Sequence, residues 1–135
     1  MKASGKILLV DDDPDFLEMH KTVLESRGYE VFTATSAQEG LGRVRAEMPD
    51  LIVLDLMMEK HDAGFSFSKT IKTDPLFRRI PILMVTSVAE ATGYRFSFEE
   101  DGYWMKTDDF LDKPVPPDVL LDTVDKLLQK RKEQE

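Results

Sequence analysis

Residues 6–13 read Lys-Ile-Leu-Leu-Val-Asp-Asp-Asp, so four apolar side chains run directly into three carboxylates. A short apolar run bounded by polar residues is typical of a buried β-strand. The same arrangement recurs at residues 51–55, where Leu-Ile-Val-Leu precedes Asp55. Because Leu51–Leu54 is apolar throughout, this strand is predicted to be covered on both faces, as strands of parallel sheets are.

Longer amphipathic stretches separate the apolar runs. Apolar residues recur at helical spacing within them, for example at Phe16 and Val23. Asp13 and Ser36 are predicted N-caps, and Pro14 suits a first helical turn. The predicted elements are the strands Lys6–Val10, Glu30–Ala34, Leu51–Leu54, Pro81–Val85 and Asp109–Leu111, and the helices Asp15–Arg27, Ala37–Glu47, Phe65–Lys72 and Pro117–Lys132.

This alternation predicts an α/β fold, a doubly wound five-stranded parallel sheet with helices on both faces. Right-handed crossovers leave few topologies, and the flavodoxin-like order 2-1-3-4-5 is the natural one for five strands. Residues 1–135 are expected to form a single domain without an output domain.

Composition limits the classes of function. The formal net charge of −8 argues against direct binding of nucleic acid, which requires clustered basic residues. The absence of cysteine excludes a disulfide framework and a cysteine nucleophile. No apolar run approaches the roughly 20 residues that span a bilayer. No membrane contact is therefore predicted, and the cytoplasm is the expected location.

Polar residues that can bind ligands or take part in reactions follow four of the predicted strands. Asp11 and Asp12 follow the first strand, Asp55 the third, Thr86 the fourth and Lys113 the fifth. The carboxyl ends of parallel strands share one edge of a sheet, where ligands of such folds bind. Carboxylates, a hydroxyl and an ammonium group are therefore predicted to share one pocket.

Asp11, Asp12 and Asp55 repel one another in such a pocket, and a divalent cation removes the repulsion. Hard oxygen ligands with room for water suit Mg²⁺ better than Zn²⁺. Asp12 and Asp55 are the predicted direct ligands, with Asp11 acting partly through water. The backbone carbonyl of Met57 is a further candidate ligand.

A carboxylate can also attack phosphorus and form an acyl phosphate. Asp55 ends the predicted middle strand and is therefore the candidate nucleophile. Lys113 can neutralise charge on the transferring group, and Thr86 can donate a hydrogen bond to it.

Four segments, KILLVDDDPDF, PDLIVLDLMM, IPILMVTS and FLDKPV, resemble the signature segments of bacterial response-regulator receiver domains, in the same order. The resemblance covers about residues 6–128. It implies that Asp55 is phosphorylated, that Asp11 and Asp12 hold Mg²⁺, and that Thr86 and Lys113 contact the phosphoryl group. The resemblance thus implies a phosphoacceptor signalling domain rather than an enzyme.

The resemblance also implies partners. The expected phosphoryl donor is a phosphohistidine on a sensor histidine kinase or a phosphotransfer protein. Phosphorylation is expected to draw Thr86 inward and to change the rotamer of Phe110. A downstream protein would then read the surface of the fourth helix, fifth strand and closing helix, together with the loop at residues 89–109.

Some features depart from the family pattern or from its function. Glu59 stands where the family usually has proline after Asp55, and the segment between Thr86 and Lys113 is a few residues longer than usual. One alternative function is that of a degenerate receiver, an unphosphorylated module that binds partner proteins. Against it, the acceptor residues are all present.

His20, on the first helix, is predicted to be a surface residue.

A second alternative is a phosphatase of the haloacid-dehalogenase type, in which the Asp-x-Asp pattern would make Asp11 the nucleophile. Against it, Pro14 begins a helix at once and leaves no room for the flap that such enzymes insert.

Overall fold

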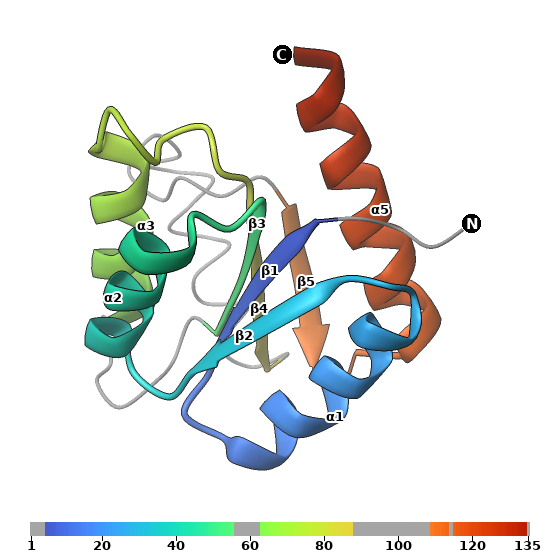
Figure 1. The fold of residues 1–135 in the computed structure, drawn as a ribbon. Coiled ribbons are helices and arrows are strands. Elements are labelled where there is room, and N and C mark those ends of the chain that lie inside the picture. The colour runs from blue at the N-terminus through green and yellow to red at the C-terminus, as the bar shows by residue number, and fades with distance from the viewer. Residues whose placement is uncertain (1–4, 56–62, 88–108, 114, 135) are drawn as a thin grey trace.

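From residue 6 to residue 87, strands and helices alternate along the chain as the apolar pattern predicts (Figure 1). The computed structural model describes residues 5–55, 63–87, 109–113 and 115–134. The strands are β1 (Lys6–Val10), β2 (Glu30–Ala34), β3 (Leu51–Asp55), β4 (Ile82–Ser87) and β5 (Asp109–Lys113). The helices are α1 (Pro14–Ser26), α2 (Ala37–Glu47), α3 (Ala63–Thr73) and α5 (Pro117–Gln134).

The strands form one five-stranded parallel sheet in the order β2-β1-β3-β4-β5, which confirms the predicted topology. β3 is the middle strand, and all five of its residues are buried. β4 and β5 each extend two residues beyond the predicted ends. Thr86 and Lys113 therefore lie inside strands rather than after them.

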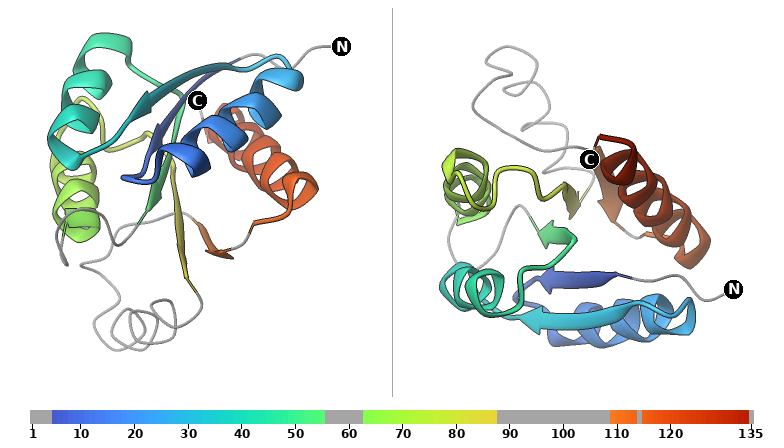
Figure 2. Two further views of the ribbon diagram at one scale, coloured as in Figure 1. Left: turned by 90° about the horizontal axis from the view of Figure 1, so that it is seen from below. Right: turned by 45° about the horizontal axis from the view of Figure 1, so that its top comes forward.

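Helices cover both faces of the sheet (Figure 2). α1 and α5 pack on one face, over a core that includes Leu9, Val53 and Val85. α2 and α3 pack on the other, over a core that includes Val10 and Leu54. Alternate residues of each strand thus enter opposite cores, as the period of a β-strand requires.

The beginnings of the first two helices follow from their caps. The carboxylate of Asp13 accepts hydrogen bonds from the backbone N–H groups of Asp15 (3.0 Å) and Phe16 (3.5 Å), and Pro14 occupies the first turn. Ser36 accepts one from the N–H of Glu39 at 3.1 Å. Both predicted N-caps are therefore confirmed.

The prediction of a surface position for His20 is wrong. Its side chain is only 2% exposed, and its ring stacks on that of Phe16 with a centroid distance of 4.0 Å. Nδ1 lies 2.9 Å from the carbonyl oxygen of Phe16. A residue four positions after a buried aromatic faces the same side of the helix, so the ring enters the core despite its polarity.

Within the described ranges, none of the helices has the length and apolar character needed to cross a lipid bilayer.

Candidate functional site

Two buried aspartates lie side by side at the carboxyl edge of the sheet. Asp55 is the last residue of β3, and Asp11 follows β1 directly. The two strands are parallel neighbours in which Val10 pairs with Leu54, so the next residue of each strand is adjacent to that of the other. The predicted convergence of the first and third strand ends is therefore confirmed.

Asp12 joins these two residues in a cluster of carboxylates. One oxygen from each of Asp11, Asp12 and Asp55 can be chosen so that all three lie within 4.8 Å of one another. Asp11 and Asp55 are 1% and 5% exposed, whereas Asp12 is exposed to solvent. The cluster thus has a buried side and an open side.

Backbone contacts orient Asp11. Its N–H donates to the carbonyl oxygen of Ala34 on β2 at 3.1 Å. One of its carboxylate oxygens accepts a hydrogen bond from the N–H of Asp13 at 2.9 Å. This second contact is an Asx turn, which is not among the features predicted from the sequence. The sequence does contain a signal for this turn, since an aspartate side chain often accepts a hydrogen bond from the backbone N–H two residues further on.

The donor set fits a magnesium ion. Magnesium binds oxygen at about 2.0–2.1 Å, so ligands on opposite sides of the ion lie roughly 4 Å apart. The observed spread of up to 4.8 Å needs only small side-chain rotations, or one ligand acting through water. The exposed position of Asp12 leaves room for the water molecules that magnesium retains.

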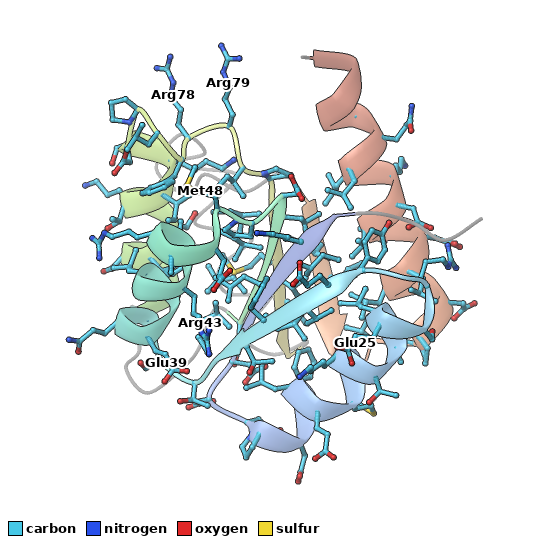
Figure 3. The ribbon with its side chains drawn as sticks, in the orientation of Figure 1. Glu25, Glu39, Arg43, Met48, Arg78 and Arg79 are labelled. Atoms are coloured by element: carbon cyan, nitrogen blue, oxygen red, sulfur yellow. The ribbon has the colours of Figure 1, made fainter. Side chains whose placement is uncertain are left out.

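Arg78 and Arg79 point away from the carboxylate cluster (Figure 3). Arg78 and Arg79 precede β4 and extend from the amino edge, at the opposite end of the molecule from Glu39 at the start of α2 (Figure 3). They therefore do not offset the charge of the three carboxylates.

The other predicted site residues are only partly described. The backbone of Thr86 pairs with Asp112, one position beyond the pair that Asp55 forms with Val85. Lys113 pairs with Ser87 on the same edge, and Phe110 pairs with Met84 further from it. The structure describes the backbone of Thr86, Lys113 and Phe110 but not their side chains, so their roles stay predictions.

The predicted carbonyl ligand of Met57, the altered position Glu59 and most of the loop at residues 89–109 lie outside the described residues.

Comparison with known proteins identifies the family. A family model described as the response regulator receiver domain matches residues 7–125. Protein PilH of Pseudomonas aeruginosa is 30% identical over 127 residues, which cover 92% of this chain and 98% of PilH.

Other relatives are longer. Response regulator PleD of Caulobacter vibrioides is 36% identical over 118 residues, covering 87% of this chain and 24% of PleD. The alkaline phosphatase synthesis transcriptional regulatory protein PhoP of Bacillus subtilis is 37% identical over 112 residues, covering 83% of this chain and 43% of PhoP. The chain thus spans less than half the length of these two relatives.

Solved structures show the same fold. The chemotaxis response regulator CheY4 of Vibrio cholerae superimposes with a TM-score of 0.79 at 29% identity, covering 93% of this chain and 99% of CheY4. A CheY-like receiver domain protein from Methanospirillum hungatei gives a TM-score of 0.83 at 28% identity, covering 98% of this chain and all of that one (100%). The chain therefore belongs to the response regulator receiver domain family of two-component systems.

Proposed function

We propose that this receiver domain accepts a phosphoryl group on Asp55 in a magnesium-dependent reaction. The observation that carries the proposal is the cluster of Asp11, Asp12 and Asp55 at the carboxyl ends of adjacent parallel strands. The proposed donor is a phosphohistidine of a sensor histidine kinase or a phosphotransfer protein, and the proposed location is the cytoplasm.

The surroundings of the two buried aspartates favour Asp55 as the nucleophile. Asp11 is 1% exposed, and one of its oxygens is already bound by the N–H of Asp13. Asp55 ends the middle strand, with β1 on one side and β4 on the other. Groups from both neighbouring strands can therefore surround a phosphoryl group on Asp55. Membership of the receiver family also leaves the phosphatase alternative, with Asp11 as nucleophile, without support.

The proposed transfer is a single displacement at phosphorus. A carboxylate oxygen of Asp55 forms a bond to phosphorus while the bond from phosphorus to the donor imidazole nitrogen breaks. The electron pair of that bond stays on the imidazole nitrogen, and the product is an aspartyl phosphate. In the later hydrolysis, water attacks phosphorus and the bond from phosphorus to the carboxylate oxygen breaks. Inorganic phosphate leaves, and Asp55 returns to its starting state.

Magnesium, when bound, would neutralise the carboxylates and part of the charge on the transferring group. Asp12 and Asp55 would bind the ion directly, Asp11 partly through water, and the Met57 carbonyl would complete the protein ligands. The exposure of Asp12 supports this division, since water must reach the remaining positions.

Thr86 and Lys113 are proposed to contact the phosphoryl oxygens. The proposal is supported by their backbone positions, because β4 and β5 carry them to the edge at which Asp55 lies. Lys113 would balance negative charge, and Thr86 would donate a hydrogen bond. We further propose that Thr86 and Phe110 move together on phosphorylation. A downstream protein would then read β5, α5 and the loop at residues 89–109.

The test is phosphorylation by a small donor. The protein is incubated with acetyl phosphate and MgCl₂, the acyl phosphate is trapped by borohydride reduction, and the modified residue is identified by peptide mass spectrometry. Label on Asp55 is expected, and none in the Asp55→Asn variant or after addition of EDTA. Label on Asp11 would instead support the phosphatase alternative. Folded protein without any label would support an unphosphorylated interaction module.

A further inference from the structure

Gly40 lies where α2 packs closely against two other elements. A β-carbon at this position would lie 2.8 Å from Cε2 of Phe67 on α3. It would also lie 3.2 and 3.3 Å from the two methyl carbons of Val10 at the end of β1. At Gly42, two residues further along the same helix, a β-carbon would meet no atom within 4 Å. The close approach is thus specific to Gly40.

The close packing lies directly beneath the carboxylate cluster. Val10 and Leu54 belong to the same core cluster as Phe67. Val10 is the residue before Asp11 in the chain, and Leu54 is the residue before Asp55. The layer formed by α2 and α3 therefore packs in the core that contains Val10 and Leu54, the residues directly before the two buried aspartates.

We infer that Gly40 and Phe67 form a size-matched pair that positions Asp11 and Asp55 for metal binding. The inference rests on the function proposed above. The ring of Phe67, 1% exposed, occupies the space that the missing side chain of Gly40 leaves free. Gly40 and Phe67 are positioning residues, since they act through Val10 and Leu54 rather than through contact with the ion.

The sheet leaves little room for another adjustment. Val10 pairs with Ala34 on β2 and with Leu54 on β3, so it is held from both sides. A methyl group at position 40 must therefore displace the ring of Phe67 or lift α2 from the sheet. Well-packed interiors transmit such displacements to their neighbours rather than absorb them.

The experiment measures magnesium affinity by calorimetry in the full chain, alongside the thermal midpoint of unfolding. Gly40→Ala is expected to weaken magnesium binding by about threefold or more, because small displacements of supporting residues weaken metal sites. Replacing Phe67 as well, in Gly40→Ala/Phe67→Leu, removes the atom that the methyl group would meet. The double variant is expected to bind magnesium within about twofold of the original protein.

Gly42→Ala is the matched control, with the same change in the same helix. Its magnesium affinity should stay within about twofold of the original, because the new methyl group meets nothing. A Gly40→Ala protein that unfolds at a lower temperature yet binds magnesium normally would overturn the inference. So would a double variant no better than the single one.

If Gly40→Ala does not fold, the double variant decides the matter. A folded double variant with near-original magnesium affinity supports the pair, and a double variant that also fails to fold or to bind magnesium overturns it. An original protein that binds no magnesium would contradict the proposed function itself, which keeps the two failures distinct.

Discussion

The phenol of Tyr29, just before β2, donates a hydrogen bond to the carboxylate of Asp125 on α5. Asp125 also forms an ion pair with Arg27, which follows the last turn of α1. This group of three residues joins α1, β2 and α5 near the amino edge of the sheet, away from the carboxylate cluster. Burial raises the pKa of Tyr29 above its ordinary value, and the hydrogen bond and charge of Asp125 raise it further.

The raised pKa of Tyr29 predicts a loss of stability at alkaline pH. The protonated phenol of Tyr29 contributes fully to stability below the ordinary pKa of 10.0, because Tyr29 then holds its proton in both the folded and the unfolded chain. Above that pH the unfolded chain releases the proton first, so stability falls by up to about 1.4 kcal/mol per pH unit. Urea unfolding of the original protein and of Tyr29→Phe, between about pH 8 and pH 11.5, measures this difference.

At neutral pH, Tyr29→Phe is expected to cost about 1 kcal/mol, the usual value of one hydrogen bond. The variant should lack the additional decline above pH 10. Parallel stability curves for the two proteins would contradict the assignment.

Magnesium is expected to stabilise the folded protein. A ligand that binds only the folded state at one hundred times its dissociation constant adds about 2.7 kcal/mol to the free energy of unfolding. The thermal midpoint should therefore rise with MgCl₂ and return after EDTA. In Asp12→Asn the affinity should fall by about tenfold or more, because the variant loses one of three clustered carboxylates. An undiminished response in that variant would argue that the ion binds elsewhere.

Asp13 is expected to act as a helix cap and not as a metal ligand. Asp13→Ala should lower the free energy of unfolding by about 1 kcal/mol, because the N–H groups of Asp15 and Phe16 lose their acceptor. Asp13→Asn should cost little, since asparagine also caps helices. Magnesium affinity should change by no more than about twofold in either variant, as the contact to Asp11 comes from the backbone of residue 13. Calorimetric titration with MgCl₂ checks this separation.

Met48 ends α2 in the left-handed conformation, with φ of 47° and ψ of 63°. Only glycine adopts this conformation without steric cost, and the Met48 side chain is 50% exposed, so it contributes little to the core. Met48→Gly is therefore expected to raise the free energy of unfolding by about 1 kcal/mol in urea titrations. Met19, 55% exposed within α1, supplies the control. Met19→Gly should lower stability by about 1 kcal/mol, because glycine is unfavourable inside a helix.

The buried ring of His20 is expected to support the start of α1. His20→Ala removes a ring that stacks on Phe16, and it should lower the free energy of unfolding by about 2–3 kcal/mol. Lys21→Ala, at the next position of the same helix, should change stability by no more than about 0.5 kcal/mol. Equal effects of the two substitutions would contradict the buried role of His20.

Most of the features that sequence predicts correctly here have local causes. The apolar run of Leu51–Leu54 needs cover on both faces wherever it lies, and it proves to be the middle strand. The Asp13 cap and the adjacent Pro14 begin a helix by local hydrogen bonding and a fixed backbone angle. The meeting of Asp11 and Asp55 is not local, but it follows from the parallel sheet that the alternation of elements predicts.

The error at His20 has a local cause, and the omission at Gly40 has one that is not local. The prediction of a surface position for His20 is wrong, although its spacing of four from both Phe16 and Leu24 matches the buried side of α1. The close approach at Gly40 depends on where α3 places Phe67, which no pattern within α2 can reveal. The roles of Thr86 and Lys113 depend on side-chain directions and stay predictions.

The contrast between Asp11 and Asp12 bears on how an ion would come and go. Since the outer carboxylate, Asp12, is exposed to solvent, a cation could reach it without displacing the core side chains of the described residues. The rate of metal exchange would then be set by the dehydration of the ion, a step that the protein influences little. Loading and unloading of the proposed magnesium ion would then not require the hydrophobic interior to open.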